Sequence, residues 1–185
     1  SVDFIGAPAR TLKEIATYRE GTVVGAAILI RVPLGQYDPE KLLNLGANRW
    51  AFRTRLGVSQ RLRRWNLELI GELWSFTRNH EAFGGVNIDQ EPILAIQANA
   101  IYRFRFRRGT WMAAGWGYGA GGKLTISGEQ KDTGQENHRF GVTFVLPVTA
   151  RNSLKFVYLN ALSTAIGADF NRGSVAWQVR WGGGV

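Results

Sequence analysis

Arginine side chains recur on alternate positions between residues 49 and 62. The odd positions include four arginines: Arg49, Arg53, Arg55 and Arg61. The even positions are mostly apolar: Trp50, Phe52, Thr54, Leu56 and Val58. Successive side chains of a β-strand point to opposite faces, so this stretch predicts a strand with one apolar face and one cationic face. A row of guanidinium groups in a pore would favour anionic or phenolate-like solutes.

The next segment, from Trp65 to Phe76, has the same alternation with an acidic polar face. If the chain turns at Arg63 and Arg64, Arg55 faces Glu72 and Ser59 faces Glu68. Two interpretations stay open. In the first, the pairs are structural and only neutralise charges that lie close together in a narrow lumen. In the second, they contribute to an electrostatic field that favours solutes of one charge.

Other reactive residues are sparse. His80 and His138 fall in expected loops without a partner at metal-ligand spacing, so no metal is expected. His138 near Ser127 is the one hint of a hydrolase, and no orienting group accompanies it. The glycine-rich 115–122 stretch lacks the lysine and hydroxyl of a phosphate loop and suits strand kinking instead. We expect no enzyme and no cofactor.

Composition limits the remaining classes. The chain has 185 residues, enough for one domain, with a net charge of +9 and no cysteine. This excess of positive charge could attract nucleic acid, anionic lipid or anionic solutes. Nucleic acid is disfavoured because the aromatic side chains share the apolar faces. No run approaches the ~18 to 20 apolar residues of a membrane-spanning helix, and the first residues lack a signal peptide, which we expect to have been removed or never recorded.

Alternation predicts about eight strands, at residues 22–32, 49–62, 65–76, 93–107, 111–120, 139–148, 154–160 and 175–181. Most approach the ~9 to 11 residues of a tilted transmembrane strand. We therefore predict an all-β fold, an antiparallel up-and-down transmembrane β-barrel. A soluble barrel or sandwich, with apolar faces turned inward, is the alternative. The long charged side chains and the aromatic ends of the apolar stripes favour the membrane.

The connections between these strands alternate in length. Short links lie around residues 63–64, 108–109 and 150–152, and long links cover 33–48, 77–92, 121–138 and 163–173. Outer-membrane barrels have short periplasmic turns and long extracellular loops, so both ends of the barrel are expected on the periplasmic side. Residues 1–21 form the expected periplasmic segment, with a short helix from Arg10 to Arg19 capped at Thr11, and residues 22–185 the barrel.

The first long link contains four residues that would suit a gate: Tyr37, Asp38, Asn44 and Asn48. Such a loop either folds inward to control a pore or caps the barrel rim, and the residues do not decide between the two.

Four stretches resemble a known family: VPLGQYDPEKLLNLGANRWAF (32–52), RWNLELIGELWSFTRN (64–79), GGKLTISG (121–128) and DFNRGSVAWQVRWGG (169–183). They are similar to outer-membrane barrel proteins of the MetA pathway of phenol degradation. The resemblance implies outer-membrane passage of hydrophobic or aromatic compounds and no catalytic residues. It also implies about a dozen strands, so the chain is either a piece lacking N-terminal hairpins or a smaller barrel. Eight strands leave an interior nearly filled by side chains.

We predict that the lumen is lined by polar residues: Arg49, Arg53, Arg55, Ser59, Glu68, Glu72, Gln97, Asn99, Arg103, Arg105, Lys155, Gln178 and Arg180. The expected function is passive passage of small hydrophobic or aromatic molecules across the bacterial outer membrane. The alternative is a closed barrel with a structural, adhesive or ligand-binding role. Expected partners are outer-membrane lipid, lipopolysaccharide and a small solute.

Overall fold

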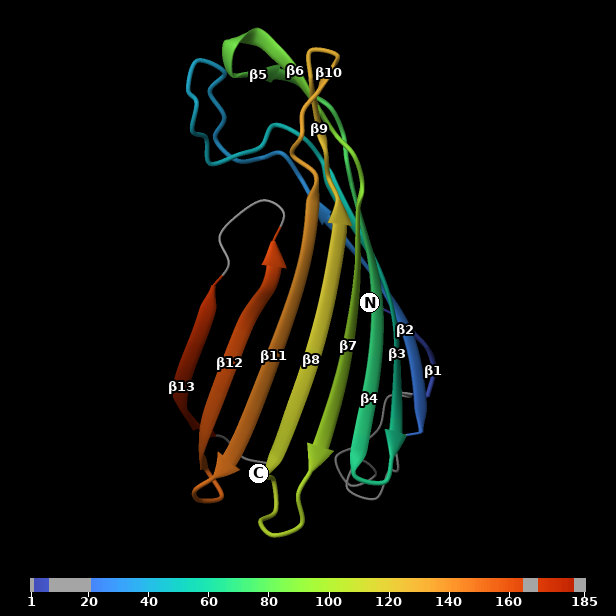
Figure 1. The fold of residues 1–185 in the computed structure, drawn as a ribbon, viewed down its shortest axis with the longest axis vertical. Coiled ribbons are helices and arrows are strands. Elements are labelled where there is room, and N and C mark those ends of the chain that lie inside the picture. Colours follow the sequence, from blue (N-terminus) through green and yellow to red (C-terminus); the bar gives the residue numbers. More distant parts are fainter. Residues whose placement is uncertain (1, 7–20, 165–169, 182–185) are drawn as a thin grey trace.

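One bowed antiparallel sheet dominates the computed structural model, which describes residues 2–6, 21–164 and 170–181 (Figure 1). Its nine strands follow the order β1-β2-β3-β4-β7-β8-β11-β12-β13. Their bounds are β1 Val2–Ile5, β2 Thr22–Arg31, β3 Ala51–Leu62, β4 Trp65–Phe76, β7 Ile93–Arg103, β8 Trp111–Gly121, β11 Gln135–Pro147, β12 Asn152–Thr164 and β13 Asn171–Val179. Neighbours in the sequence are neighbours in the sheet, as expected for an up-and-down arrangement.

All eight segments that alternate in the sequence form strands, and β1 adds a ninth that the alternation did not predict. Within the described residues the sheet ends at β1 and β13, and these two strands are not paired with each other. The structure therefore shows the antiparallel wall of the predicted barrel without its closure. The expected helix at Arg10–Arg19 lies outside the described residues.

Two strands end more than one residue earlier than their sequence patterns indicate: β13 ends at Val179 instead of Trp181, and β7 shows the larger difference. The alternation runs to Arg107, whereas β7 ends at Arg103. The reason is the reversal of the chain at Gly109, which has a positive φ of 86°. The Phe104 amide still donates to the Thr110 carbonyl at 3.0 Å, and the residues between them form the turn instead of the ladder.

From β2 to β12 short and long connections alternate as predicted and gather at opposite ends of the sheet (Figure 1). The predicted long link of residues 163–173 is shorter, because β12 continues to Thr164 and β13 begins at Asn171. The short ones are residues 63–64, 104–110 and 148–151. The long ones contain a second antiparallel sheet of order β10-β9-β6-β5. Its strands are β5 Asn79–Ala82, β6 Val86–Gln90, β9 Leu124–Ile126 and β10 Glu129–Gln130, and a 3-10 turn (η1, Phe83–Gly85) joins β5 to β6. These strands lie in links that the sequence predicted to be loops.

The two faces of the long sheet differ in chemistry and in exposure. On β4, Leu67, Leu69 and Leu73 are exposed, whereas Glu68 and Glu72 on the opposite face are half-buried. We name the polar face the inner face and the apolar face the outer face. Among the described residues, the buried apolar side chains are only four small ones: Ala51, Ala82, Val145 and Ala161. This distribution is the inverse of a soluble sandwich, whose apolar faces would be buried.

No helix in the described part of the chain is long and apolar enough to cross a membrane.

Candidate functional site

The inner face carries an ion-paired ladder between β3 and β4. The two-residue turn at Arg63 and Arg64 sets the register so that Arg55 faces Glu72 and Ser59 faces Glu68, as the sequence predicted. Arg55 Nε donates to Glu72 Oε1 at 2.7 Å, and Arg53 Nη1 lies 3.7 Å from Glu72 Oε2. The Arg53 guanidinium also lies 5.0 Å from the ring centre of Trp74. One carboxylate thus compensates two cations in a partly desolvated setting.

Below this pair an amide network continues across β4 and β7. Glu68 accepts hydrogen bonds from Asn66 Nδ2 at 3.0 Å and from Asn99 Nδ2 at 3.2 Å. Gln97 Nε2 donates to Asn99 Oδ1 at 3.2 Å. Ser59, although opposite Glu68, donates to Asn66 Oδ1 at 3.1 Å. The inner face therefore offers fixed polar groups along three adjacent strands.

A stripe of glycines follows these amides on the next strand. The register places Gly115 beside Asn99, Gly117 beside Gln97 and Gly119 beside Ala95. A Cβ atom at Gly115 would lie 2.5 Å from Asn99 Oδ1, so the side chain of Asn99 occupies the space that glycine leaves free. Backbone alone forms the inner surface of this part of β8, which leaves room beside the polar network.

The remaining predicted lumen residues are more dispersed. The register places Arg103 opposite Trp111 at the end of β7, and Lys155 and Gln178 on the inner face of β12 and β13. Gln178 accepts a long hydrogen bond from Ser153 Oγ at 3.5 Å. Three residues lie outside the strands: Arg49 before β3, Arg105 in the 104–110 turn and Arg180 after β13.

The predicted gating loop is fastened to the small sheet through a residue that the sequence analysis missed. Asn79, at the start of β5, is 5% exposed. Its Nδ2 donates to Tyr37 Oη at 3.1 Å, and its Oδ1 accepts from Asn48 Nδ2 at 3.2 Å. Tyr37 Oη in turn donates to the Glu81 carbonyl at 2.8 Å. Asn79 sits in a polar loop sequence with no periodic signal, so only these contacts reveal its role.

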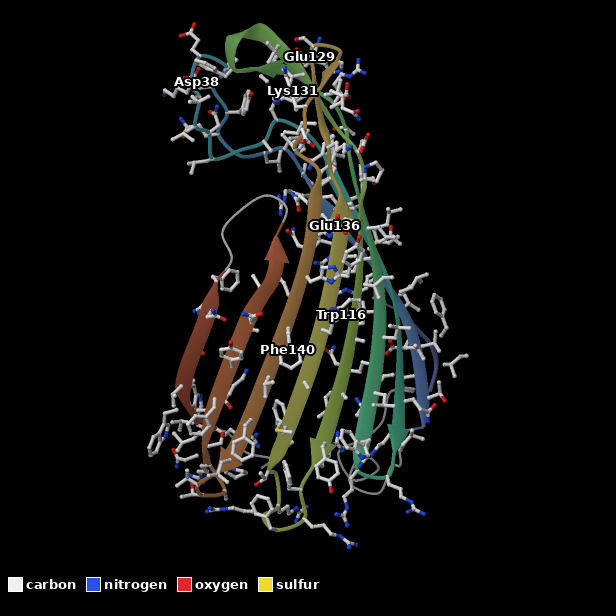
Figure 2. The ribbon with its side chains drawn as sticks, in the orientation of Figure 1. Asp38, Trp116, Glu129, Lys131, Glu136 and Phe140 are labelled. Carbon is white, nitrogen blue, oxygen red and sulfur yellow. The ribbon has the colours of Figure 1, made fainter. Side chains whose placement is uncertain are left out.

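A local turn orders the other half of the loop. Asn44 Oδ1 accepts from the Asp38 amide at 2.8 Å, and Asn44 Nδ2 donates to the Asp38 and Lys41 carbonyls. Hydrogen bonds from the Glu40 amide and from Lys41 lower the pKa of Asp38 below its usual value. Figure 2 shows Asp38 beyond the ends of the long strands, at the end of the molecule that also carries the Glu129–Lys131 ion pair.

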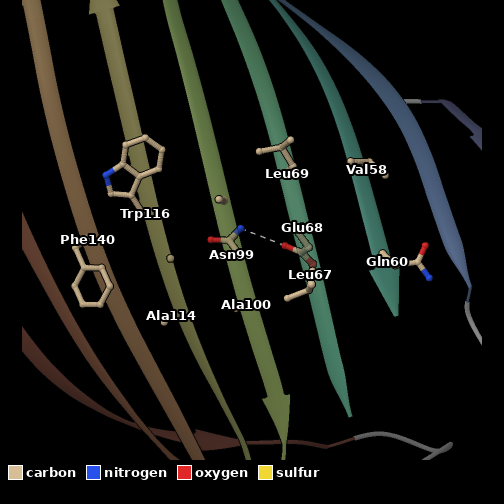
Figure 3. Close-up of a pocket in the computed structure, with 12 residues that line it drawn as sticks. Val58, Gln60, Leu67, Glu68, Leu69, Asn99, Ala100, Ala114, Trp116 and Phe140 are labelled. Carbon is tan, nitrogen blue, oxygen red and sulfur yellow. Dashed lines mark hydrogen bonds between the residues drawn. The ribbon is translucent and has the colours of Figure 1, made fainter. Parts of the chain in front are cut away.

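The outer face has the character of a lipid-contacting surface. Aromatic rings meet near the short turns, where Phe104 lies 4.9 Å from Tyr102 and 6.2 Å from Phe144. Towards the middle of the strands, Ala98, Ala100 and Ala114 form the floor of a shallow apolar groove (Figure 3). Aromatic belts flanking an aliphatic band are typical of transmembrane barrels.

Within the described residues, no cluster of three or more histidine, aspartate or glutamate side chains could hold a metal ion.

Comparison with known proteins gives two matches. A family model described as "Putative MetA-pathway of phenol degradation" matches residues 15–174. The fold is similar to that of an outer membrane channel from Pseudomonas putida F1, with a TM-score of 0.70 and 25% sequence identity over 84% of this chain. The match covers 58% of that channel's chain. No curated protein matches the sequence.

Proposed function

Because the chain belongs to the family of the MetA pathway of phenol degradation, we propose that it forms the wall of a channel for small hydrophobic or aromatic molecules. The similarity of its fold to an outer membrane channel supports a place in the bacterial outer membrane and a channel-like role. The neighbour is a channel, and the passage of aromatic solutes through this chain is our proposal.

The contrast between the two faces of the long sheet is the observation that carries this proposal. An apolar outer face satisfies the hydrocarbon core, and a polar inner face suits a hydrated interior. The inner face combines near-neutral charge pairing at Arg55 and Glu72 with the open glycine stripe of β8. A charged group that is paired with an opposite charge binds water less strongly than an isolated one. An aromatic solute that passes such a pair would therefore displace water at a lower cost in free energy.

The solute path in this proposal follows the inner face from the loop end to the short turns. It passes the ladder of β3, β4 and β7 before the inner residues of β12 and β13. The loop at Tyr37 and Asn48 stands at its start, where the bonds to Asn79 would hold it in one position. In this scheme the loop is a rim that narrows access.

Efflux from liposomes tests the proposal. Protein purified from outer membranes would be reconstituted, with folding checked by heat-modifiable gel mobility, and the vesicles loaded with 4-nitrobenzenesulfonate. This aromatic anion stays ionised at neutral pH and crosses a lipid bilayer slowly, so faster release than from empty vesicles is expected. If protein that gel mobility shows to be folded releases the solute no faster than an equal amount of heat-denatured protein, the channel is refuted and a closed barrel is favoured.

A further inference from the structure

A hollow of about 510 Å³ lies between the loop of residues 33–50 and the small sheet. Its walls are mostly apolar and come from three connections, with Leu42 from the loop, Phe83 and Val86 from the β5–β6 segment, and Leu124 from β9. This volume lies within the usual range of small-molecule sites, ~300 to 1,000 Å³. The hollow is separate from the inner-face ladder.

A guanidinium group closes one side of this hollow. Arg49 Nη2 donates to Gln90 Oε1, and the group lies 4.7 Å from the ring centre of Phe76. Arg49 Nη1 is buried and has no hydrogen-bond partner. Burying a charged N–H group without an acceptor is energetically costly. A negatively charged partner for Arg49 would offset this cost.

A second positive charge lies close to Arg49. Arg31, at the end of β2, lies close enough for its charge to lower the pKa of Arg49, after the larger effect of burial. In the described part of the chain neither arginine forms a salt bridge. The nearby carboxylate of Asp89 is engaged by Arg78 at 2.8 Å. Arg49, which lines the hollow, thus has a cationic neighbour and, among the described residues, no salt-bridge partner.

We propose that this hollow binds an aromatic monocarboxylate, with its carboxylate on the Arg49 guanidinium and its ring against Phe83 and the adjoining aliphatic walls. A guanidinium without a salt-bridge partner and a second cation close to it suit a single carboxylate. The site rests on the proposed function and deepens it, because it would collect anionic aromatic solutes at the start of the path.

Calorimetric binding of benzoate to the protein in detergent micelles tests the site, with benzyl alcohol as a probe of equal size but no charge. Benzoate is expected to bind and benzyl alcohol to bind at least about tenfold more weakly, since a charge-assisted bond contributes ~1.5 to 3 kcal/mol. Arg49→Gln should weaken benzoate binding by a similar factor. Arg63→Gln, in the turn at the opposite end, removes the same charge and should leave affinity unchanged.

Three results would overturn the site: no benzoate binding to the wild-type protein, equal affinity for benzyl alcohol, or equal loss in Arg63→Gln. The first two results are measured on the wild-type protein. They therefore test the proposal even if the Arg49→Gln variant does not fold. Conductance in KCl separates the two proposals. A conducting channel that fails to bind benzoate refutes the site alone, and a silent but folded protein refutes the channel.

Discussion

Arg55 and Glu72 face each other across β3 and β4, and Arg55 Nε donates to Glu72 Oε1 at 2.7 Å. The Glu72 side chain is 13% exposed and also lies within ion-pair distance of Arg53. Because this carboxylate serves two guanidinium groups, its removal would leave two like charges side by side on the inner face.

Replacement of Glu72 by glutamine should therefore lower the free energy of unfolding by about 1 to 3 kcal/mol, the usual cost of a charged group left without its partner. Urea unfolding in lipid vesicles, followed by tryptophan fluorescence, would measure the change. Glu129→Gln is the matched control, since Glu129 is 75% exposed in its pair with Lys131 and such pairs contribute ~0 to 1 kcal/mol. Equal losses in the two variants would contradict the special role of Glu72.

Gly115 and Gly117 provide a comparison within one strand. A Cβ atom at Gly115 would displace Asn99 and with it the hydrogen bond to Glu68, whereas at Gly117 the nearest atom is 3.8 Å away. Gly115→Ala should cost about 1 kcal/mol or more from overpacking, and Gly117→Ala should cost less. The same unfolding assay measures both. If Gly117→Ala proves as costly as Gly115→Ala, the glycines serve strand curvature and not the space of Asn99.

The long strands were predictable because each residue on them has only two possible orientations. A two-residue turn at Arg63 and Arg64 then fixes the register, which is why the pairing of Arg55 with Glu72 followed from the sequence alone. The end of β7 did not follow, because alternation continues through the turn to Arg107 while the chain has already reversed.

The small sheet and its buried hub were beyond sequence reasoning for a different reason. Strands β5, β9 and β10 have two to four residues each, too few to show a period. Asn79 acts through contacts with Tyr37 and Asn48, which are more than thirty residues distant in the sequence. The free Nη1 of Arg49 likewise depends on how the loop, β6 and Phe76 assemble around it.

Replacement of Asn79 by alanine should release the loop of residues 33–50. The variant loses the bonds to Tyr37 and Asn48 and leaves Asn48 Nδ2 without this acceptor, at a cost of about 1 to 3 kcal/mol, while Tyr37 keeps its bond to the Glu81 carbonyl. Hydrogen exchange in the loop should rise while that of β3 and β4 stays unchanged. Asn87→Ala, on an exposed position of β6, is the control. A loop that stays protected in Asn79→Ala would show that apolar contacts hold it.

Leu69 and Ile70 test which face of the sheet meets lipid, because they are adjacent on β4 and point to opposite faces. Leu69 is 52% exposed on the outer face, whereas Ile70 lies on the inner face opposite Gln97. In lipid vesicles, Leu69→Arg should reduce the free energy of unfolding by about 2 to 4 kcal/mol, the cost of arginine near the bilayer midplane. Ile70→Arg introduces the same group beside Glu68 and Glu72 and should cost markedly less. The reverse order would assign the apolar face to the interior and overturn the membrane orientation of the sheet.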